Sequence, residues 1–413
     1  MQLLEGMIRT YAWGSRTAIA EFTGRPAPAP HPEAELWLGA HPGDSAVLLG
    51  PQGSTSLLTA IESDPVGQLG AAVSREFGAV LPFLVKILAA GEPLSLQAHP
   101  SATQAAEGYA REEQRGLPIN SPIRNYRDPH HKPELLLALT EFHALAGFRP
   151  AAQSVTFMRA LGLPALDPYI ALLVEGSDAA GLRALFTTWI TLPQPDLDVL
   201  IPAVLDAVVD YVRTGSGHSE FGAEARTLLE LGERYPGDAG VLAAMLLNRI
   251  ILDPGQAVFL PAGNLHSYLL GMGIEVMANS DNVLRGGLTP KHVDVPELLR
   301  ILDFTPVSEL RVPTRIDGIE TTYHTPTVEF AASVLTLGAD DSGLPIAVPP
   351  RPDGPQLLIC IDGAVTLRCE SEELRLRRGA AAWIEAADGP VQISSLGTAT
   401  VFRATVGNSA IRS

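Results

Sequence analysis

The stretch GQAVFLPAGNLH, residues 255–266, indicates the fold of this chain most directly. Its apolar run AVFL predicts a short strand, and Pro261 with Gly263 marks a turn because both residue types interrupt regular pairing. Strand character returns in SYLLGMGIEVMA, residues 267–278. This strand–turn–strand unit predicts a β-rich body in which His266 stands at the start of the second strand.

A second strand-forming stretch, GEPLSLQAHPS at residues 91–101, carries Gln97 and His99 two positions apart. Side chains at that spacing point to the same face of a strand, where both can reach one metal ion. By their Gly, Pro and His spacings, the two stretches resemble the first and second motifs of the cupin superfamily. The usual first histidine is glutamine here. The resemblance implies a jelly-roll barrel with a metal ion inside it.

An acidic ligand does not follow His99 at the usual short distance, and HHKPELLLAL at residues 130–139 supplies one instead. The predicted ligands offer two nitrogens and two oxygens: Gln97, His99, Glu134 and His266. Zinc accepts such donors at about 2.0–2.2 Å, but imidazole also suits iron, nickel and copper. The residue types therefore predict a metal site without fixing the metal, and the absence of thiolates argues against a purely structural zinc site.

The segment GIEVMANSDNVLRGGLTPKHVDV, residues 273–295, continues the strand that carries His266. Alternation in IEVMA places Glu275 on that strand. Arg285 follows a dense polar cluster at residues 279–282. A guanidinium just after a metal-bearing strand is suited to bind an anion or a developing oxyanion.

Seven segments together resemble type I mannose-6-phosphate isomerase, also called phosphomannose isomerase, and they occur in that family's order. They are YAWGS at 11–15, AELWLGAHP at 34–42, LPFLVKIL at 81–88, SLQAHPS at 95–101, HHKPE at 130–134, PAGNLHSYL at 261–269 and SDNVLRGGLTPKHVDV at 280–295. The resemblance is weaker in the middle of the chain and in the last hundred residues.

The resemblance implies a role for each matching residue. One zinc ion per chain would be bound at the family's ligand positions, Gln97, His99, Glu134 and His266. The implied catalytic residues are Arg285, Lys86, His131, Lys132 and Glu275. The implied substrate-binding residues are Ser95 and Lys291. Trp13 is expected to belong to the core or to the wall of the pocket, where it would contact substrate. The implied reaction interconverts D-mannose 6-phosphate and D-fructose 6-phosphate by proton transfer through an enediol.

The sequence does not decide which of these residues acts as base, as acid or as phosphate ligand. Each lysine is suited either to hold phosphate or to transfer protons, and a lysine beside Zn²⁺ and other cations would have a lowered pKa. His131 suits a ring-opening proton because imidazole titrates near neutral pH, and Glu275 is either a base or the partner of a cation. Each residue also has a plain structural interpretation, such as Lys86 extending outward from its apolar strand to solvent.

Two other functions compete with an isomerase. A non-catalytic sugar-binding cupin would keep the metal and lack the chemistry, and a cupin oxygenase would hold iron at an open site. Arg285, Glu275 and the lysines argue against the first. Gln97 in place of a histidine and the basic cluster argue against the second. The direction of the pathway, GDP-mannose biosynthesis or mannose catabolism, stays open.

Composition restricts the partners. The 413 residues include 29 Lys and Arg against 46 Asp and Glu, a formal net charge of −17. So acidic a chain is poorly suited to nucleic acid or an anionic membrane, and we expect a small sugar phosphate held by a local basic cluster. The N-terminus has no signal-peptide pattern, and no run reaches about 18 apolar residues. We expect a cytoplasmic monomer whose two cysteines are buried core thiols.

The predicted fold is mainly β with a helical insertion, comprising two cupin-type jelly-roll barrels and an all-α domain. Short strands between Gly and Pro turns in residues 1–150 and 251–310 predict the metal-binding cupin domain. Helical spacing of apolar residues predicts an insertion domain at 151–250, with its last helix over 238–252. Short strands return in 311–413, which we predict to be a second, metal-free cupin-like barrel.

Overall fold

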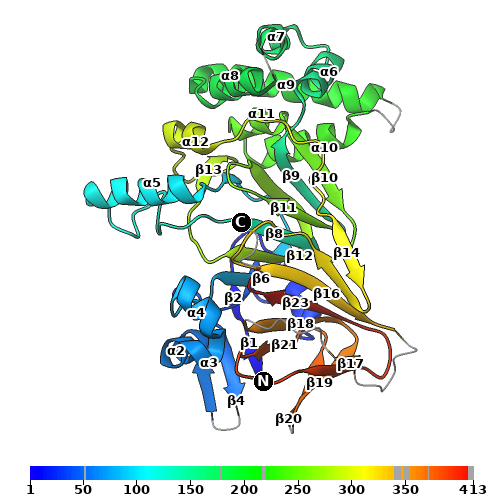
Figure 1. Cartoon of the computed structure of the whole chain (residues 1–413). Helices are drawn as coiled ribbons and strands as arrows, with labels where there is room; N and C mark the ends of the chain where they lie inside the picture. Colours follow the sequence, from blue (N-terminus) through cyan, green and yellow to red (C-terminus); the bar gives the residue numbers. More distant parts are fainter. Residues whose placement is uncertain are drawn as a thin grey trace.

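A computed structural model describes residues 1–50, 53–176, 178–215, 220–338, 346–347, 354–370 and 372–407. Helices α6 to α9, in residues 151–214, gather at one end of the molecule, and β-sheets with flanking helices build the rest (Figure 1). Helix and strand are both abundant. The prediction of a mainly β chain is therefore confirmed only in part, because the chain is of mixed class.

The first sheet carries most of the predicted site. Its strands are β2 (Met7–Arg9), β3 (Glu35–Leu38), β6 (Phe83–Ala90), β7 (Leu96–Ala98), β8 (Glu134–Ala138), β9 (Phe142–Phe148), β10 (Leu247–Leu252), β11 (Ala257–Leu260), β12 (His266–Ala278) and β13 (Leu284–Gly287). Strand β12 lies at its centre and pairs antiparallel with β6, β7, β8 and β9. Residues from distant parts of the chain meet along this one strand.

Strand β6 is buried on both faces, which accounts for its apolar sequence. Val85 and Ile87 belong to the core shared with the second sheet, whereas Leu88 belongs to a separate core on the opposite face. Lys86 has the same parity as Leu88 and so shares its face. Only 9% of the Lys86 side chain is exposed. The interpretation of Lys86 as a lysine reaching outward to solvent is therefore wrong.

The second sheet joins the two ends of the chain. Its order is β14 (Thr314–Asp317), β15 (Glu320–Tyr323), β16 (Ala331–Leu337), β23 (Ala399–Thr405), β18 (Gln356–Asp362), β21 (Ala381–Ile384), β1 (Gln2–Glu5), β4 (Val47–Gly50) and β5 (Gly53–Ser56). Strand β1 pairs with β21 and with β4. Strands near the N-terminus thus complete a sheet built mostly after residue 314, a pairing that the predicted domain ranges do not contain.

A smaller sheet packs into the C-terminal core. Its order is β17 (Ile346–Ala347), β22 (Gln392–Ser394), β19 (Ala364–Cys369) and β20 (Glu372–Arg377). Cys360 and Cys369 are both buried and free. The prediction of two core thiols is confirmed.

Consecutive helices follow β9. They are α6 (Ala151–Ala160), the 3₁₀ helix η1 (Pro164–Leu166), α7 (Asp167–Glu175), α8 (Asp178–Ile190), α9 (Gln194–Thr214), α10 (Gly222–Arg234) and α11 (Gly240–Ala244). The predicted helix over 238–252 is wrong beyond Ala244, because Leu247–Leu252 forms β10 and pairs with β9. Pairing with a strand a hundred residues earlier overrides the local helical pattern.

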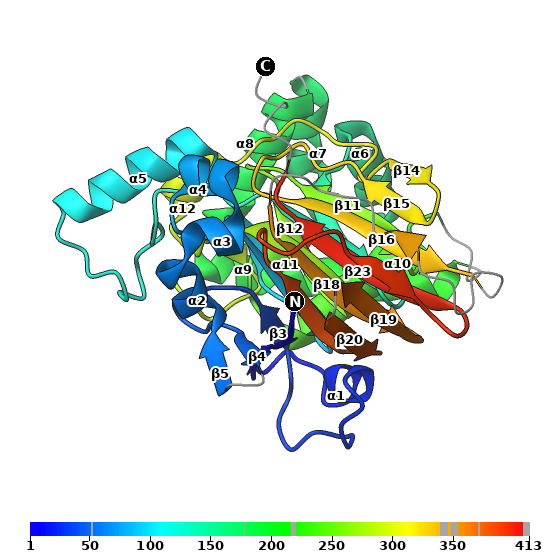
Figure 2. The same ribbon diagram turned by 60° about the horizontal axis from the view of Figure 1, so that its bottom comes forward.

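The remaining helices flank the sheets. They are α1 (Ala18–Phe22), α2 (Leu57–Ser63), α3 (Pro65–Leu69), α4 (Ala71–Phe77), α5 (Ala102–Gln114) and α12 (Val295–Ile301). Helices α2 to α4 stand together beside β4 and β5, and α5 projects from the body (Figure 2). Among the helices of the described ranges, none has the length and apolar character that crossing a membrane requires.

Candidate active site

Three predicted metal ligands meet in the first sheet. His99 Nε2 lies 3.3 Å from Glu134 Oε1, and His266 Nε2 lies 3.4 Å from Glu134 Oε2. The three side chains are buried, with ligand atoms within 4.8 Å of one another. Within the described ranges, His99 Nε2, Glu134 Oε2 and His266 Nε2 have no hydrogen-bond partner. Buried polar atoms are rarely left unpaired, so this convergence fits a metal ion with nitrogen and oxygen ligands.

Backbone carbonyls orient both imidazole rings. His99 Nδ1 lies 2.8 Å from the carbonyl oxygen of Asn282, and His266 Nδ1 lies 3.0 Å from that of Asn264. A carbonyl can only accept, so each Nδ1 carries the proton and each Nε2 presents its lone pair toward Glu134. Burial lowers the pKa of His99 to about 4. The ring is therefore neutral at pH 7, as metal ligation requires.

Gln97 occupies a suitable position for a fourth ligand. It pairs directly with His266 between β7 and β12, and with Arg285 between β7 and β13. Directly paired residues of an antiparallel ladder share a face, with Cβ atoms about 4.5–5.5 Å apart. Gln97, His266 and Arg285 therefore form a row across three strands. Ligation by Gln97 stays a prediction.

A chain of buried charged groups lies on the same sheet. Lys86 Nζ is 3.2 Å from Glu275 Oε2 and 3.7 Å from Glu35 Oε1. The Tyr268 hydroxyl donates to Glu275 Oε1 at 2.9 Å, and Trp37 Nε1 donates to Glu35 Oε2 at 2.7 Å. Glu35 and Tyr268 escaped the sequence analysis, although Tyr268 follows His266 by two positions and so shares its face on β12.

The pKa values of Lys86 and Glu275 are both shifted by their buried, charged neighbours. Burial alone would lower the pKa of Lys86, but the charges of Glu35, Glu275 and Glu134 outweigh burial and raise it. The expectation of a lowered pKa assumed a lysine among cations, whereas the charged neighbours of Lys86 are carboxylates. Burial, followed by the charge of Glu134, raises the pKa of Glu275.

Three cations, Arg127, Arg285 and Lys291, are near enough for the charge of one to affect the pKa of another. Burial and the charge of Arg127 lower the pKa of Arg285. Burial and the charges of Arg285 and Arg127 lower the pKa of Lys291. Within the described ranges, none of the three forms an ion pair with a carboxylate. Arg127 was not predicted; its backbone N–H donates to the buried side chain of Asn282 at 2.7 Å.

His131 and Lys132 are adjacent but have different neighbours. Lys132 Nζ lies 3.2 Å from Glu134 Oε1, with 8% of its side chain exposed. His131 instead has Nε2 at 2.8 Å from Glu329 Oε1, with 32% of its side chain exposed. His131 and Glu329 both line a cavity of about 690 Å³. Lys132 thus lies with the metal cluster, whereas His131 contacts a carboxylate that no sequence pattern had marked.

Aromatic and polar groups flank the site. Trp13 packs against the core around Leu88 and stacks on Tyr11 with ring centroids 5.7 Å apart. Ser95 is half-buried two residues before Gln97. Contact of Trp13 and Ser95 with a substrate stays a prediction. His41, which the sequence left as a structural or surface residue, lies 3.4 Å from Asp281 Oδ2.

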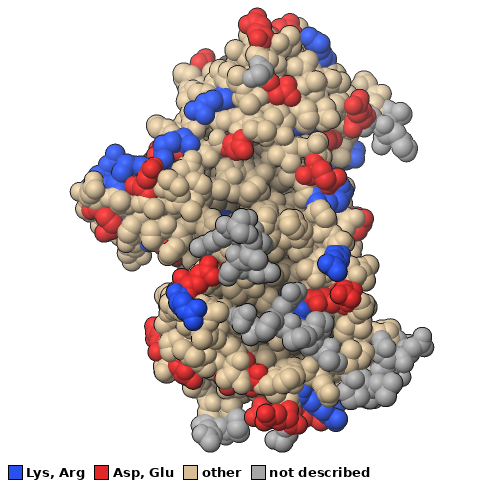
Figure 3. All heavy atoms as spheres, viewed as in Figure 1, with Lys and Arg blue, Asp and Glu red and all other residues tan. Residues whose placement is uncertain are grey.

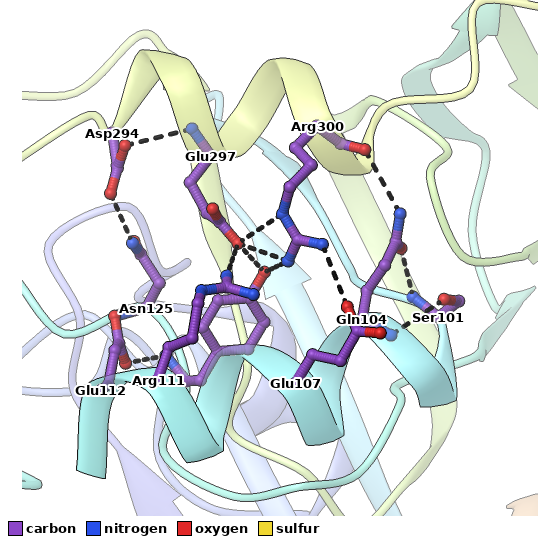
Figure 4. Close-up of polar contacts among 10 residues, drawn as sticks. Ser101, Gln104, Glu107, Arg111, Glu112, Asn125, Asp294, Glu297 and Arg300 are labelled. Carbon is purple, nitrogen blue, oxygen red and sulfur yellow. Dashed lines mark hydrogen bonds and ion pairs between the residues drawn. The ribbon is translucent and has the colours of Figure 1, made fainter. Parts of the chain in front are cut away.

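Helix α5 begins just after His99 and is bound to α12 by polar contacts (Figure 4). Glu297 accepts from Arg111 at 2.7 Å and from the Tyr126 hydroxyl at 2.5 Å. Asn125 donates to Asp294 at 2.8 Å. On the face shown in Figure 3, Lys and Arg gather on the projecting α5 region. The contacts of residues 125 and 126 hold the segment that leads into Arg127.

The chain is similar in sequence to known enzymes. The family described as "Phosphomannose isomerase type I, catalytic domain" matches residues 1–151. The mannose-6-phosphate isomerase of Escherichia coli (strain K12) is 38% identical over 400 residues, which cover 96% of this chain and 98% of the relative. That of Homo sapiens is 33% identical over 350 residues, which cover 78% of this chain and 79% of the relative.

Solved structures extend the likeness to three dimensions. The K86A mutant of phosphomannose isomerase from Salmonella typhimurium has a TM-score of 0.89 and 35% identity, covering 99% of this chain and 100% of that chain. A mannose 6-phosphate isomerase bound with zinc and yttrium has a TM-score of 0.88 and 35% identity, with the same coverage. The likeness thus includes the helices and the last hundred residues, where the sequence motifs are weaker.

Proposed function

The chain belongs to the mannose-6-phosphate isomerases, and we propose that it interconverts D-mannose 6-phosphate and D-fructose 6-phosphate through an enediol. The converging, unpartnered atoms of His99, Glu134 and His266 carry this proposal. We infer one Zn²⁺ per chain, with Gln97 as the fourth ligand; the zinc-bound relative supports this choice. When bound, zinc supplies a Lewis acid that polarises the sugar oxygens.

We infer a finer architecture as well. Two cupin-type jelly rolls and an all-α insertion at 151–250 account for the motif spacing and for the run of helices after β9. The first unit comprises 1–150 and 251–310, and the second comprises 311–413. Action as a monomer in the cytoplasm stays an expectation from the sequence.

Glu275 is the proposed base for proton transfer between C1 and C2. Its carboxylate accepts from Tyr268 and pairs with Lys86, so its position is fixed before substrate arrives. Burial raises its pKa, toward the range in which a carboxylate both accepts and returns a proton near neutral pH. Lys132 lies beside Glu134 and is the proposed donor to the developing oxyanion.

Arg285, Lys291 and Arg127 form the proposed phosphate site, with Ser95 as a further donor. Burial, and after it the charges of neighbouring cations, lower the pKa values of Arg285 and Lys291. A phosphate dianion would relieve the repulsion among these cations and accept charge-assisted hydrogen bonds. This arrangement favours a phosphorylated sugar over a free one.

Replacing Arg127 by glutamine should raise KM for mannose 6-phosphate about tenfold, equivalent to about 1.4 kcal/mol of binding. We expect kcat to change less than about threefold, because phosphate contacts act on ground state and transition state alike. Steady-state kinetics measure both constants. The matched control is Arg115→Gln, an exposed arginine just after α5. An unchanged KM in R127Q would exclude Arg127 from the phosphate site.

A coupled assay of mannose 6-phosphate to fructose 6-phosphate, before and after chelation, tests the whole proposal. We expect activity to disappear on chelation and to return when Zn²⁺ is added. A fully zinc-loaded protein that binds the sugar without turnover would support the non-catalytic cupin. Bound Fe²⁺ with oxygen consumption would support the oxygenase.

A further inference from the structure

Glu329 reaches His131 from 198 positions away in the sequence. It lies in the segment before β16, in the second sheet, whereas His131 precedes β8 in the first. The His131 Nε2 to Glu329 Oε1 distance is 2.8 Å, and 13% of the Glu329 side chain is exposed. A residue of the segment that leads into the second sheet thus forms a direct polar contact with the HHKPE segment that carries Glu134.

Glu329 is itself held in place. The Thr327 hydroxyl donates to Glu329 Oε2, and the backbone N–H of Gly407 donates to the Val328 carbonyl at 3.1 Å. Burial opposes ionisation, but the hydrogen bonds from His131 and Thr327 outweigh it and lower the pKa of Glu329 to about 2. The group is therefore a fixed carboxylate at any pH at which the protein would work.

An ionised carboxylate can only accept, so His131 Nε2 carries a proton in this contact. In neutral imidazole the lone pair then belongs to Nδ1. Within the described ranges, no group is hydrogen-bonded to His131 Nδ1, and the ring lines the cavity of about 690 Å³. The geometry leaves Nδ1 as the atom that can accept a proton from a ligand.

We propose that Glu329 is a positioning residue that holds His131 in the Nε2–H tautomer and so makes His131 Nδ1 the base for ring opening. The inference rests on the proposed function. Nδ1 takes the proton of the anomeric hydroxyl, C1–O1 becomes a carbonyl, and the C1–O5 bond breaks. O5 takes a proton from water, and His131 then gives its proton to the hydroxide that remains, which restores both water and the neutral imidazole. Glu329 stabilises the imidazolium formed meanwhile, as the carboxylate does in a Ser-His-Asp triad.

Replacing Glu329 by glutamine tests this role. A carboxamide can donate to Nε2 and favours the Nδ1–H tautomer, so we expect kcat to fall about 10–100-fold with KM within about threefold. The acid limb of the kcat profile should move to lower pH, because imidazolium loses its anionic partner. Other titratable side chains lining the cavity are Glu76 and His130. Glu329→Asp should recover most of the loss, and the exposed Glu373, paired with Arg368, supplies the matched control Glu373→Gln.

Nitrogen NMR of histidine in the unmodified protein provides a second, independent measurement. We expect His131, assigned by its loss in His131→Gln, to be protonated at Nε2. Wild-type kcat and an unshifted pH profile in E329Q would overturn the proposal, as would an Nδ1–H tautomer in the wild type. If E329Q does not fold, the wild-type tautomer and E329D decide. A zinc-loaded wild type without turnover would refute the proposed function. The NMR spectrum reports the His131 tautomer without requiring turnover, so the two failures are distinguishable.

Discussion

Replacing Glu134 by glutamine should remove the bound zinc and lower isomerase turnover by at least about a thousand-fold. Losing a partner outside the ligand shell of a metal site costs roughly 10–100-fold, and the loss of the single carboxylate ligand should cost more. Glu134 lies between His99 and His266, and Lys132 is its only other close charged partner within the described ranges. Its neutralisation would leave Lys132 beside the metal without a counter-charge.

Metal content per chain and turnover are measured on the same sample. Glutamine has nearly the shape of glutamate, so the fold should survive, and circular dichroism checks this. The matched control is Glu141→Gln, because Glu141 is 67% exposed at its side chain and pairs only with His143 among the described residues. Full zinc occupancy with turnover within tenfold of wild type would show that Glu134 is not a ligand.

The metal cluster was predictable because its residues obey local rules. His99 directly follows β7, whose residues Leu96–Ala98 the sequence marks as a strand, and His266 opens a strand after a Pro/Gly turn. These segments are far apart in the sequence, and the pairing of β12 with β7 and β8 brings them together. Tyr268 lies two positions after His266 on β12, so strand alternation would have placed it on the same face.

The surroundings of these residues were less predictable. No residue near Lys86 in the sequence predicts its contact with Glu35, because the two residues are brought together by the pairing of β3 with β6. Despite burial, the carboxylates around Lys86 raise its pKa. Glu329 lies in a region of weak sequence resemblance and has no local signature at all. Electrostatic environment depends on which strands become neighbours, and a single sequence does not specify that.

Residues 247–252 show a related limit for the fold. The sequence LNRIIL is apolar enough to continue a helix, and its apolar residues extend the helical spacing of α11. A short apolar run fits either structure, and length and neighbours decide between them. Here Asn248 settles into β10 and donates from its side chain to the carbonyls of Ala146, Gly147 and Phe148.

Replacing Arg285 by alanine should lower kcat about a thousand-fold while leaving zinc bound. Arg285 pairs with Gln97 between β13 and β7, so its side chain shares the face of Gln97 and His266. Besides its part in the phosphate site, Arg285 is proposed as a second donor to the developing oxyanion, beside Lys132. Removing a single well-placed donor of that kind costs about 10²–10³-fold. Loss of part of the phosphate site should raise KM as well. Arg285→Lys keeps the charge but loses the planar pair of donors, and we expect about a hundred-fold loss.

The reason for expecting zinc retention is geometric. Arg285 provides no hydrogen bond to His99, Glu134 or His266, whose rings and carboxylate are oriented by Asn282, Asn264 and one another. Metal analysis of R285A should therefore equal wild type, and added guanidinium should restore part of its kcat. Arg311→Ala, an exposed arginine outside the cation group, is the control. Turnover retained in R285A would show that Arg285 has no catalytic role, and loss of zinc would show that it acts through the metal site.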